Sequence, residues 1–263
     1  MTFSVIIPAF NAAATIERAI QSCRNQSFPP LEIIVVDDAS EDDTSRITES
    51  FAPSVRLIRL PENKGVAYAR NAGWREAVGS HIAFLDSDDE WHPDKLKIIA
   101  AYFDRRPEIK LIYHPYTLAE FGRSPHWENQ KLTPYPFWKL LFTNPLQTSC
   151  ICVAGNIGLQ FNEKFRYCED HEFVLRVASK YKCYQLPLKL TRLDQPQLLG
   201  GGLSGNIWKM RKGEMKMYRN LWRIHLLLTP LIPVFLLGSV MKHVWRWMSI
   251  NSGREYHRKK NKS

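Results

Sequence analysis

Cysteine is scarce in this sequence, and its cysteines follow none of the spacings that define a cysteine-based site. The 263 residues contain five cysteines, with no CxxC pair and no zinc-ligand spacing among them. An odd number of cysteines without a framework is typical of a reducing compartment. The sequence therefore argues against a disulfide-stapled fold and against a zinc module.

The first residues lack the features of several other classes. The stretch MTFSVIIPAFN has no basic region and no cleavage site, so it predicts a β-strand rather than a signal peptide. No GxGxxG follows this strand, which argues against a dinucleotide-dependent dehydrogenase. The following PAFNAAATIERAI also lacks the glycine-rich basic loop expected of a nucleotidyltransferase.

Excess positive charge is missing from most of the chain, although the formal net charge is +10. Residues 206–263 contain 13 of the 36 Lys and Arg and only 2 of the 26 Asp and Glu. The formal net charge of residues 1–205 is therefore −1. A basic tail does not make a nucleic-acid-binding body, so no nucleic-acid partner is predicted. We expect a domain over residues 1–205 and a separate segment over residues 206–263.

Short apolar strands alternate with helices in the first half of the chain. This alternation predicts βαβ units, that is, an α/β fold with a mostly parallel sheet and helices on both faces. The predicted strands are residues 3–8, 31–38, 55–60, 81–85 and 109–114, and the predicted helices are 12–24, 40–51, 65–77 with Asn63 near its N-cap, and one from Pro93 to about Arg106. The second half predicts strands at 147–154 and 181–187, a helix at 169–180 and a glycine-rich loop at 197–206.

The tail contains an apolar stretch, residues 224–241, broken by Pro230 and Pro233. Arginines and lysines flank it on both sides, and tryptophans lie near its edges. Eighteen residues are at the short limit for a membrane-spanning helix, whereas these flanks suit a helix lying on anionic lipid. We predict a helical tail that associates with a membrane surface, with a spanning helix and a buried helix pair as the alternatives.

Polar groups follow three of the predicted strands at the point where each ends. Phe10 and Asn11 follow the first strand, Asp37 and Asp38 the second, and the run from Asp86 to Glu90 the fourth. Ligands of open parallel sheets bind at this edge, and carboxylates there suit Mg²⁺ or Mn²⁺. A cation so held would gather phosphate oxygens, so a metal–diphosphate is expected. A turn role is favoured for Asp37, and a turn or supporting role for Asp89 and Glu90.

Five stretches in order carry a resemblance to a known family. The stretches that carry the resemblance are SVIIPAFN, EIIVVDDAS, NKGVAYARNAG, FLDSDDEWHPDKL and CEDHEF. Over roughly residues 3–206, the chain resembles the family 2 glycosyltransferases of the GT-A fold. The resemblance implies a Rossmann-like GT-A domain that transfers a sugar from a nucleotide-diphosphate sugar to a hydroxyl group with inversion. The sugar is expected to be a hexose or an N-acetylhexosamine.

The resemblance also implies roles for particular residues. Pro8, Ala9 and Phe10 are expected to line the base and ribose of the nucleotide sugar. Three further residues are expected at the nucleotide: Asp38, Arg70 and Asp86. Asp88 is the expected direct metal ligand, and Asp86 binds either the metal, its water or the ribose. Asp170, of the Glu169–Asp170 pair, is the expected catalytic base.

Those residue types suit the chemistry of glycosyl transfer. Departure of a diphosphate builds negative charge that Mn²⁺ or Mg²⁺ stabilises, and a carboxylate removes the proton of the attacking hydroxyl. A single base without a nucleophile implies inversion. The basic tail favours an acceptor held at a membrane, a glycan or glycolipid such as a lipid-linked or surface-polysaccharide precursor, on the cytoplasmic face of the plasma membrane. A UDP-sugar is the favoured donor.

The sequence departs from the family pattern in two places. Ala39 stands where the family commonly has glycine, and no third metal ligand can be assigned, with His92 and His171 as the nearest candidates. Trp127 and Trp138 are expected to form walls on the acceptor side. The alternative interpretation is a non-catalytic binding or scaffold protein that retains the GT-A fold.

Overall fold

The computed structural model describes residues 1–122, 124–144, 146–194 and 207–241. The chain forms two compact units, residues 1–196 and 197–263. The boundary expected at residues 205 and 206 and the glycine-rich loop expected at 197–206 lie outside the described residues.

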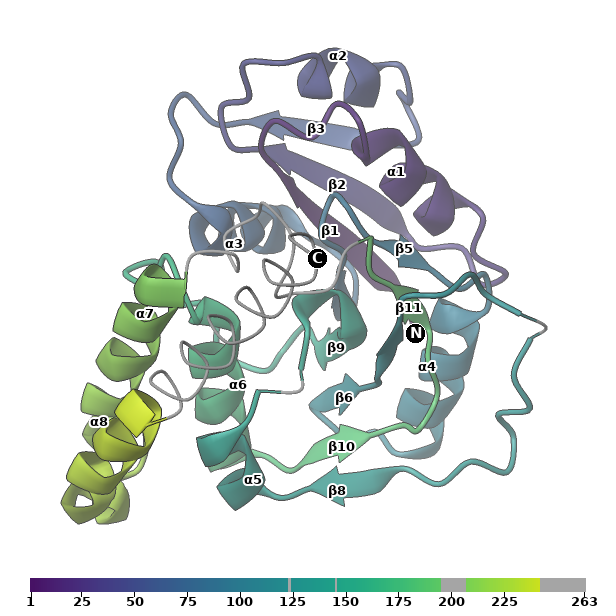
Figure 1. The fold of residues 1–263 in the computed structure, drawn as a ribbon. Coiled ribbons are helices and arrows are strands. Elements are labelled where there is room, and N and C mark those ends of the chain that lie inside the picture. The colour runs from purple at the N-terminus through teal and green to yellow at the C-terminus, as the bar shows by residue number, and fades with distance from the viewer. Residues whose placement is uncertain (123, 145, 195–206, 242–263) are drawn as a thin grey trace, which may run out of the picture. The chain divides into compact units, whose positions relative to one another are not determined.

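The first unit is built on an eight-stranded sheet in the order β3-β2-β1-β4-β9-β6-β10-β8 (Figure 1). Its strands are β1 (Phe3–Ala9), β2 (Glu32–Asp37), β3 (Arg56–Arg59), β4 (His81–Phe84), β6 (Leu111–Tyr113), β8 (Thr133–Tyr135), β9 (Ile151–Ala154) and β10 (Cys183–Gln185). The four strands from β1 to β4 pair in parallel, as the sequence predicts. The α/β fold with a mostly parallel sheet is confirmed.

The edge strand β8 runs antiparallel to β10, and β9 is an antiparallel strand in the interior of the sheet. It lies between β4 and β6 and runs antiparallel to both. A short 3₁₀ turn, η1 (Thr148–Cys150), precedes it, so the strand expected over residues 147–154 begins four residues later. A second, three-stranded sheet has the order β5 (Glu90–Trp91), β11 (Thr191–Arg192) and β7 (Tyr116–Thr117).

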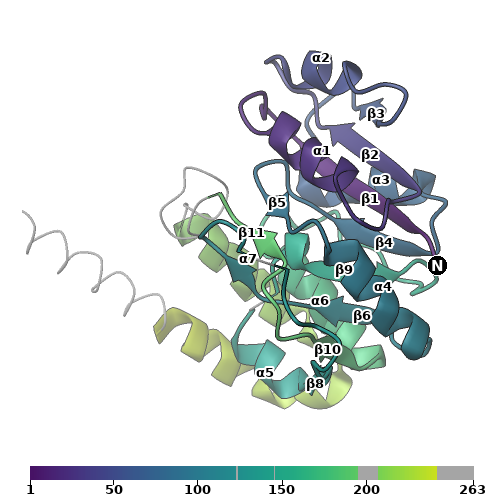
Figure 2. The ribbon, with the colours of Figure 1, turned by 90° about the vertical axis from the view of Figure 1, so that its right-hand side faces the viewer.

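Helices cover both faces of the large sheet. Helices α1 (Ile16–Arg24) and α4 (Lys95–Arg105) pack on one face, in a core cluster with alternate residues of β1. Helix α3 (Val66–Glu76) packs on the other face, against Ile34 and Val36 of β2. Figure 2 shows α1 and α4 in front of the sheet and α3 and α6 (Glu169–Lys180) behind it. The remaining helices of this unit are α2 (Thr44–Glu49) and α5 (Phe137–Phe142).

Gly73 sets how closely α3 approaches the sheet. A Cβ atom added at this position would lie 2.7 Å from Cγ2 of Ile6 and 3.1 Å from Cγ2 of Val36. Both neighbours are fully or almost fully buried branched side chains, which cannot move aside freely. Packing therefore explains Gly73, the second of the two glycines within NKGVAYARNAG.

We expect Gly73→Ala to lower the free energy of unfolding by about 1–3 kcal/mol, because the added methyl group overpacks the helix–sheet contact. Urea unfolding followed by circular dichroism measures the change. Gly122→Ala is the matched control, since a Cβ there meets nothing within 4 Å. A loss of stability that is equal in the two variants would contradict the packing explanation.

The second unit is helical. It contains α7 (Ile207–Arg219), α8 (Leu221–Ile224) and the 3₁₀ helix η3 (Leu226–Leu231), and residues 232–241 are helical as well. Within it, Tyr218 stacks on Phe235 with ring centroids 5.5 Å apart. Pro230 lies inside η3, so the predicted apolar stretch is broken into short pieces. In the part of the chain that is described, no helix combines the length and the apolar character needed to cross a membrane.

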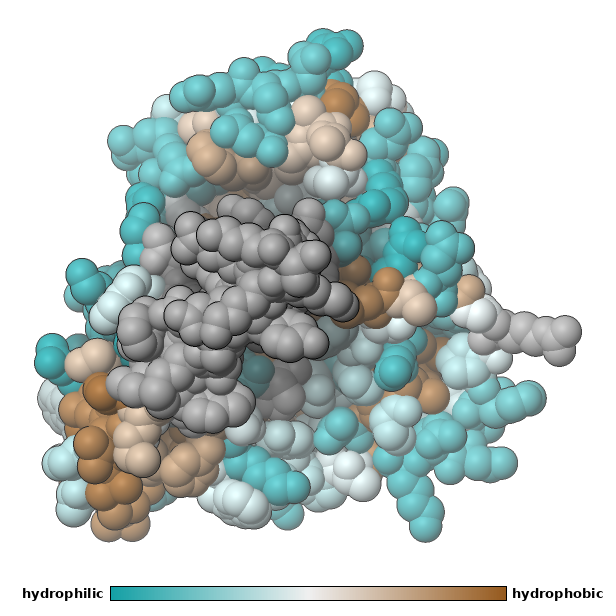
Figure 3. All heavy atoms as spheres, viewed as in Figure 1, coloured by the Kyte–Doolittle hydropathy of each residue, from teal (hydrophilic) through white to brown (hydrophobic). Residues whose placement is uncertain are grey.

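Apolar side chains of this unit face solvent. The exposed ones are Trp208, Trp222, Leu226, Leu227, Leu231, Val234, Leu237, Val240 and Met241. Figure 3 shows hydrophobic surface, in brown, over part of this unit. Contiguous exposed apolar surface of this kind marks an interaction site more often than chance.

Candidate active site

Three strand ends meet at one edge of the large sheet. β1 lies between β2 and β4, and all three run in the same direction. Ala9 pairs with Asp37 across β1 and β2, and the amide of Asp38 donates to the carbonyl oxygen of Ala9 at 2.8 Å. The residues after β1, β2 and β4 therefore face one rim, as expected for an open parallel sheet.

The end of β1 offers one exposed side chain to this rim. Pro8 and Ala9 are buried, whereas the Phe10 side chain is 49% exposed. Asn11 follows with φ at +49°, a left-handed conformation that side chains with a β-carbon adopt infrequently. Of the three residues expected at the base and ribose, Phe10 is the one whose ring is free to stack.

The two aspartates after β2 hold local structure. Asp37 accepts from the amide of Ser40 at 2.9 Å and from the Ser45 hydroxyl, which agrees with the turn role favoured for it. Asp38 is 3% exposed, and its carboxylate accepts from the amides of Lys64 and Gly65 at 2.7 and 2.8 Å. Asp38 thus joins the end of β2 to the start of α3.

Two further backbone positions at this rim have a positive φ. The N-cap of α3 is Gly65 at φ +90°, while Asn63, expected near that cap, donates to the Asp38 carbonyl. Ala39 has φ +63°, so the glycine common at this place in the family would fit the left-handed backbone with less strain.

The run after β4 concentrates negative charge. Ser149 joins two parts of it, because its hydroxyl accepts from the Asp86 amide at 2.9 Å and donates to the Asp89 carboxylate at 2.5 Å. Burial, and then the charges of Asp86 and Asp88, raise the pKa of Asp89 to about 8. Partial removal from water and the charge of Asp86 also raise the pKa of Asp88.

Arg70 of α3 is the positive partner of this cluster. Its guanidinium is 4% exposed and forms two ion pairs, with Asp86 at 2.7 Å and with Glu169 at 3.0 Å. Burial opposes the charge, but the two carboxylates outweigh it and raise the pKa of Arg70 above its ordinary value. Its donors contact two acids in this structure, and the contact expected between Arg70 and a nucleotide stays a prediction.

Helix α6 begins at the acid pair that the sequence singles out. Cys168 precedes it in the left-handed region, at φ +59°. Glu169 is buried, and burial followed by the charge of Asp170 raises its pKa to about 7 although Arg70 opposes this. Asp170 is half-buried and accepts from the Asn144 side chain at 2.8 Å and from the His171 amide at 2.7 Å.

The structure adds residues to this rim that sequence reasoning missed. Arg18 of α1 donates to the Asp88 carbonyl at 2.6 Å and to the Asp194 carboxylate at 2.7 Å. Lys95 is fully buried and donates to the Ser149 carbonyl at 2.6 Å. No local pattern marks these residues, because the fold brings each of them to the rim from a different part of the chain. Lys95 lies within the motif FLDSDDEWHPDKL, and Arg18 lies within none of the five motifs.

The residues expected to bind a metal are Asp88 and Asp86, with His92 or His171 as candidates for a third ligand. Among the described residues, no group of three or more His, Cys, Asp and Glu is arranged to hold a metal ion. One ring nitrogen of His92 accepts from the Asp94 amide, and one of His171 bonds to the Leu140 carbonyl at 2.5 Å; the third ligand stays unassigned. Two carboxylates, Asp86 and Asp88, nevertheless lie close together after β4, and their oxygens suit a divalent cation that shares its coordination with diphosphate oxygens.

The two tryptophans expected on the acceptor side have different surroundings. Trp127 packs against Tyr102 of α4 and the core, with ring centroids 6.3 Å apart. Trp138 is 60% exposed on α5, the helix that bonds to α6 through Leu140 and His171. Only Trp138 therefore lies on an element next to the acid pair.

Comparison with known proteins identifies relatives. The model of the family "Glycosyl transferase family 2" matches residues 4–164. A putative teichuronic acid biosynthesis glycosyltransferase, TuaG of Bacillus subtilis, is 43% identical over 84% of this chain and 89% of its own length. The amylovoran biosynthesis glycosyltransferase AmsB of Erwinia amylovora is 27% identical over 84% of this chain and 76% of its own length.

Solved structures share the fold. Residues 1–349 of S. aureus TarS, in complex with UDP-GlcNAc, match with a TM-score of 0.67 and 21% identity over 84% of this chain and 67% of that one. The mannosyltransferase PcManGT from Pyrobaculum calidifontis, in complex with GDP-Man and Mn²⁺, matches with a TM-score of 0.65 and 18% identity over 91% of this chain and 73% of that one. Together with the sequence relatives, these likenesses confirm the expected GT-A fold, and the chain belongs to glycosyl transferase family 2.

Proposed function

We propose that the chain transfers a sugar from a nucleotide-diphosphate sugar to a hydroxyl acceptor by a single displacement with inversion. The observation that carries this proposal is the chain of contacts from Asp86 through Arg70 to Glu169, which brings the acidic run after β4 and the start of α6 onto one rim. Asp170 is the general base. Its carboxylate is held by Asn144 and keeps solvent access, so it can reach an acceptor hydroxyl.

Asp88 and Asp86 would hold Mn²⁺ or Mg²⁺. When bound, the cation supplies charge stabilisation to the departing diphosphate. The relation of the chain to PcManGT, whose structure contains Mn²⁺, supports a divalent cation without fixing which one. The protein itself contributes the rigid strand ends that keep the two carboxylates together.

Phe10 stacks on the base in this proposal, and the backbone at Pro8 and Ala9 lines the ribose. Asp38 acts through the Lys64 and Gly65 amides, which its carboxylate fixes at the edge of the nucleotide site. A UDP-sugar is the favoured donor, since TarS was solved with UDP-GlcNAc and with UDP. The transferred group would be a hexose or an N-acetylhexosamine.

The acceptor in this proposal is a lipid-linked or surface-polysaccharide precursor. Relatives named for teichuronic acid and amylovoran biosynthesis support a polysaccharide acceptor. The exposed apolar side chains of the second unit, together with its excess of lysine and arginine, support attachment at the cytoplasmic face of the plasma membrane. The alternative, a non-catalytic protein on the same fold, loses support because Asp86, Asp88 and Asp170 are all retained and Arg70 links Asp86 to Glu169, the neighbour of Asp170.

Calorimetric titration with UDP, GDP and dTDP, with and without Mn²⁺, tests this proposal. We expect one nucleotide to bind, with an affinity at least about tenfold higher when Mn²⁺ is present, because the cation offsets the repulsion between diphosphate and the acidic run. The Asp88→Ala variant should lose the Mn²⁺ effect. Absence of binding by all three nucleotides in wild-type protein would favour the non-catalytic alternative.

A further inference from the structure

Arg70 is a single buried cation shared by two functional carboxylates. One nitrogen of its guanidinium donates to Asp86 of the expected metal site, and the other donates to Glu169 beside the expected base. Planar guanidinium groups suit such two-sided pairing because their donors point in fixed directions. A change of charge at either acid must therefore change the electrostatic interaction between Arg70 and the other acid.

The plane of this guanidinium is supported from one side. The ring of Phe161 lies under it, with the Arg70 Cζ atom 5.3 Å from the ring centroid. Phe161 is itself 4% exposed and stacks on Phe173 of α6 with centroids 4.4 Å apart. Arg70 consequently cannot swing away from the two acids without losing a packed aromatic contact.

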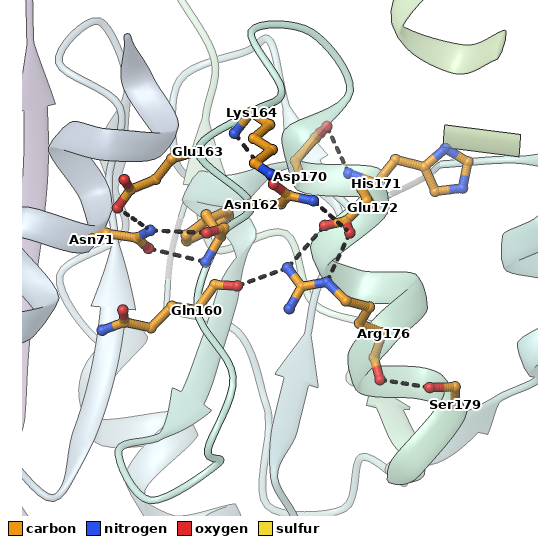
Figure 4. Close-up of polar contacts among 11 residues, drawn as sticks. Asn71, Gln160, Asn162, Glu163, Lys164, Asp170, His171, Glu172, Arg176 and Ser179 are labelled. Atoms are coloured by element: carbon orange, nitrogen blue, oxygen red, sulfur yellow. Dashed lines mark hydrogen bonds and ion pairs between the residues drawn. The ribbon is translucent and has the colours of Figure 1, made fainter. Parts of the chain in front are cut away.

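The backbone of residues 160–162 is held between two helices, as Figure 4 shows in part. The Asn71 side chain of α3 donates to the Phe161 carbonyl and accepts from its amide, both at 2.9 Å. Arg176 of α6 donates to the Gln160 carbonyl at 2.7 Å while it forms a two-point ion pair with Glu172. These contacts fix the Phe161 ring, and through it the place of Arg70.

We propose that Arg70 is a positioning residue that competes with a divalent cation for Asp86 and so couples the charge at the metal site to Glu169, the neighbour of the base. This inference rests on the proposed function. Without a cation, Arg70 divides its charge between Asp86 and Glu169. Neutralising Glu169 leaves the full guanidinium charge to Asp86, which weakens cation binding there. Removing the guanidinium does the opposite.

The test is a titration of the full-length protein with Mn²⁺ alone, followed by the loss of the free-ion EPR signal, and a second series with UDP added. Glu169→Gln should bind Mn²⁺ about three- to tenfold more weakly than wild type, and Arg70→Gln should bind it more tightly by a similar factor. If Arg70 and Glu169 only stabilised the fold, the two substitutions would not change the Mn²⁺ affinity in opposite directions. Circular dichroism and thermal unfolding identify any variant that does not fold. The Mn²⁺ affinity of the other variant then tests the inference.

Glu163→Gln is the matched control. It removes the same charge next to the segment 160–162, and its Oε1 atom can still accept from Asn71 and Arg75, but it does not contact Arg70. Its Mn²⁺ affinity should stay within about twofold of wild type. Equal affinities in wild type and Glu169→Gln would overturn the inference alone. Absence of both Mn²⁺ and UDP binding in wild type would overturn the proposed function as well.

Discussion

Replacing Asp170 by asparagine is expected to lower kcat by about 10³-fold while leaving nucleotide affinity within about threefold of wild type. An amide cannot take the proton of the acceptor hydroxyl, and loss of a general base costs about 10²–10⁴ in rate. The fold should be retained, since the carboxamide oxygen can still accept from the Asn144 side chain. Nucleotide release from a UDP-sugar with an acceptor measures kcat, and calorimetry with UDP and Mn²⁺ measures affinity.

Asp104→Asn is the control for this substitution, since Asp104 is an exposed residue of α4. It should leave both quantities unchanged. A kcat for Asp170→Asn within about threefold of wild type would remove Asp170 as the base. Glu169 could not then simply take its place, because its carboxylate is buried and paired with Arg70.

The double substitution Leu226→Ser and Leu227→Ser is expected to reduce binding to vesicles that contain anionic lipid by about 100-fold or more. These side chains are 73% and 81% exposed at the start of η3. Transfer of one leucine side chain from water to an apolar phase is worth about 1.5–3 kcal/mol, so two of them dominate a surface attachment. Co-sedimentation with vesicles of phosphatidylglycerol and phosphatidylcholine measures the bound fraction.

Leu31→Ser and Leu118→Ser provide the matched control, because these leucines are 53% and 52% exposed in the first unit. This pair should sediment with vesicles as wild type does. Binding of wild type should also fall as salt is raised, since lysines and arginines of the second unit contribute. Unchanged sedimentation of the Leu226 and Leu227 variant would refute membrane attachment through this surface.

The elements with a strong local signal were predicted well. The helix expected over residues 169–180 is α6 (Glu169–Lys180), because its acidic first turn and its apolar spacing agree. The helix expected over residues 12–24 begins only at Ile16, since residues 13–15 form a turn. Where signals were local, errors are confined to the ends of elements, at which helix and turn compete closely.

Features that depend on distant residues were not predictable. The antiparallel direction of β9 leaves no trace in its apolar pattern, since a buried strand has the same pattern in either direction. Arg70 is 16 residues from Asp86 and 99 from Glu169, and only the fold brings these side chains together. A sequence motif could place Arg70 near the site but could not show that two acids occupy its donors.

The place of β9 in the sheet has a consequence for the order in which the chain can fold during synthesis. Strands β1 to β4 are neighbours in sequence and in space, so this half can assemble as soon as it leaves the ribosome. Strand β6 is the next strand of this sheet to be made, but β9 separates it from β4. The edge of β4 therefore stays unpaired until about 70 further residues have been made; β9 then joins β4 to β6, and β10 is added beyond β6 afterwards.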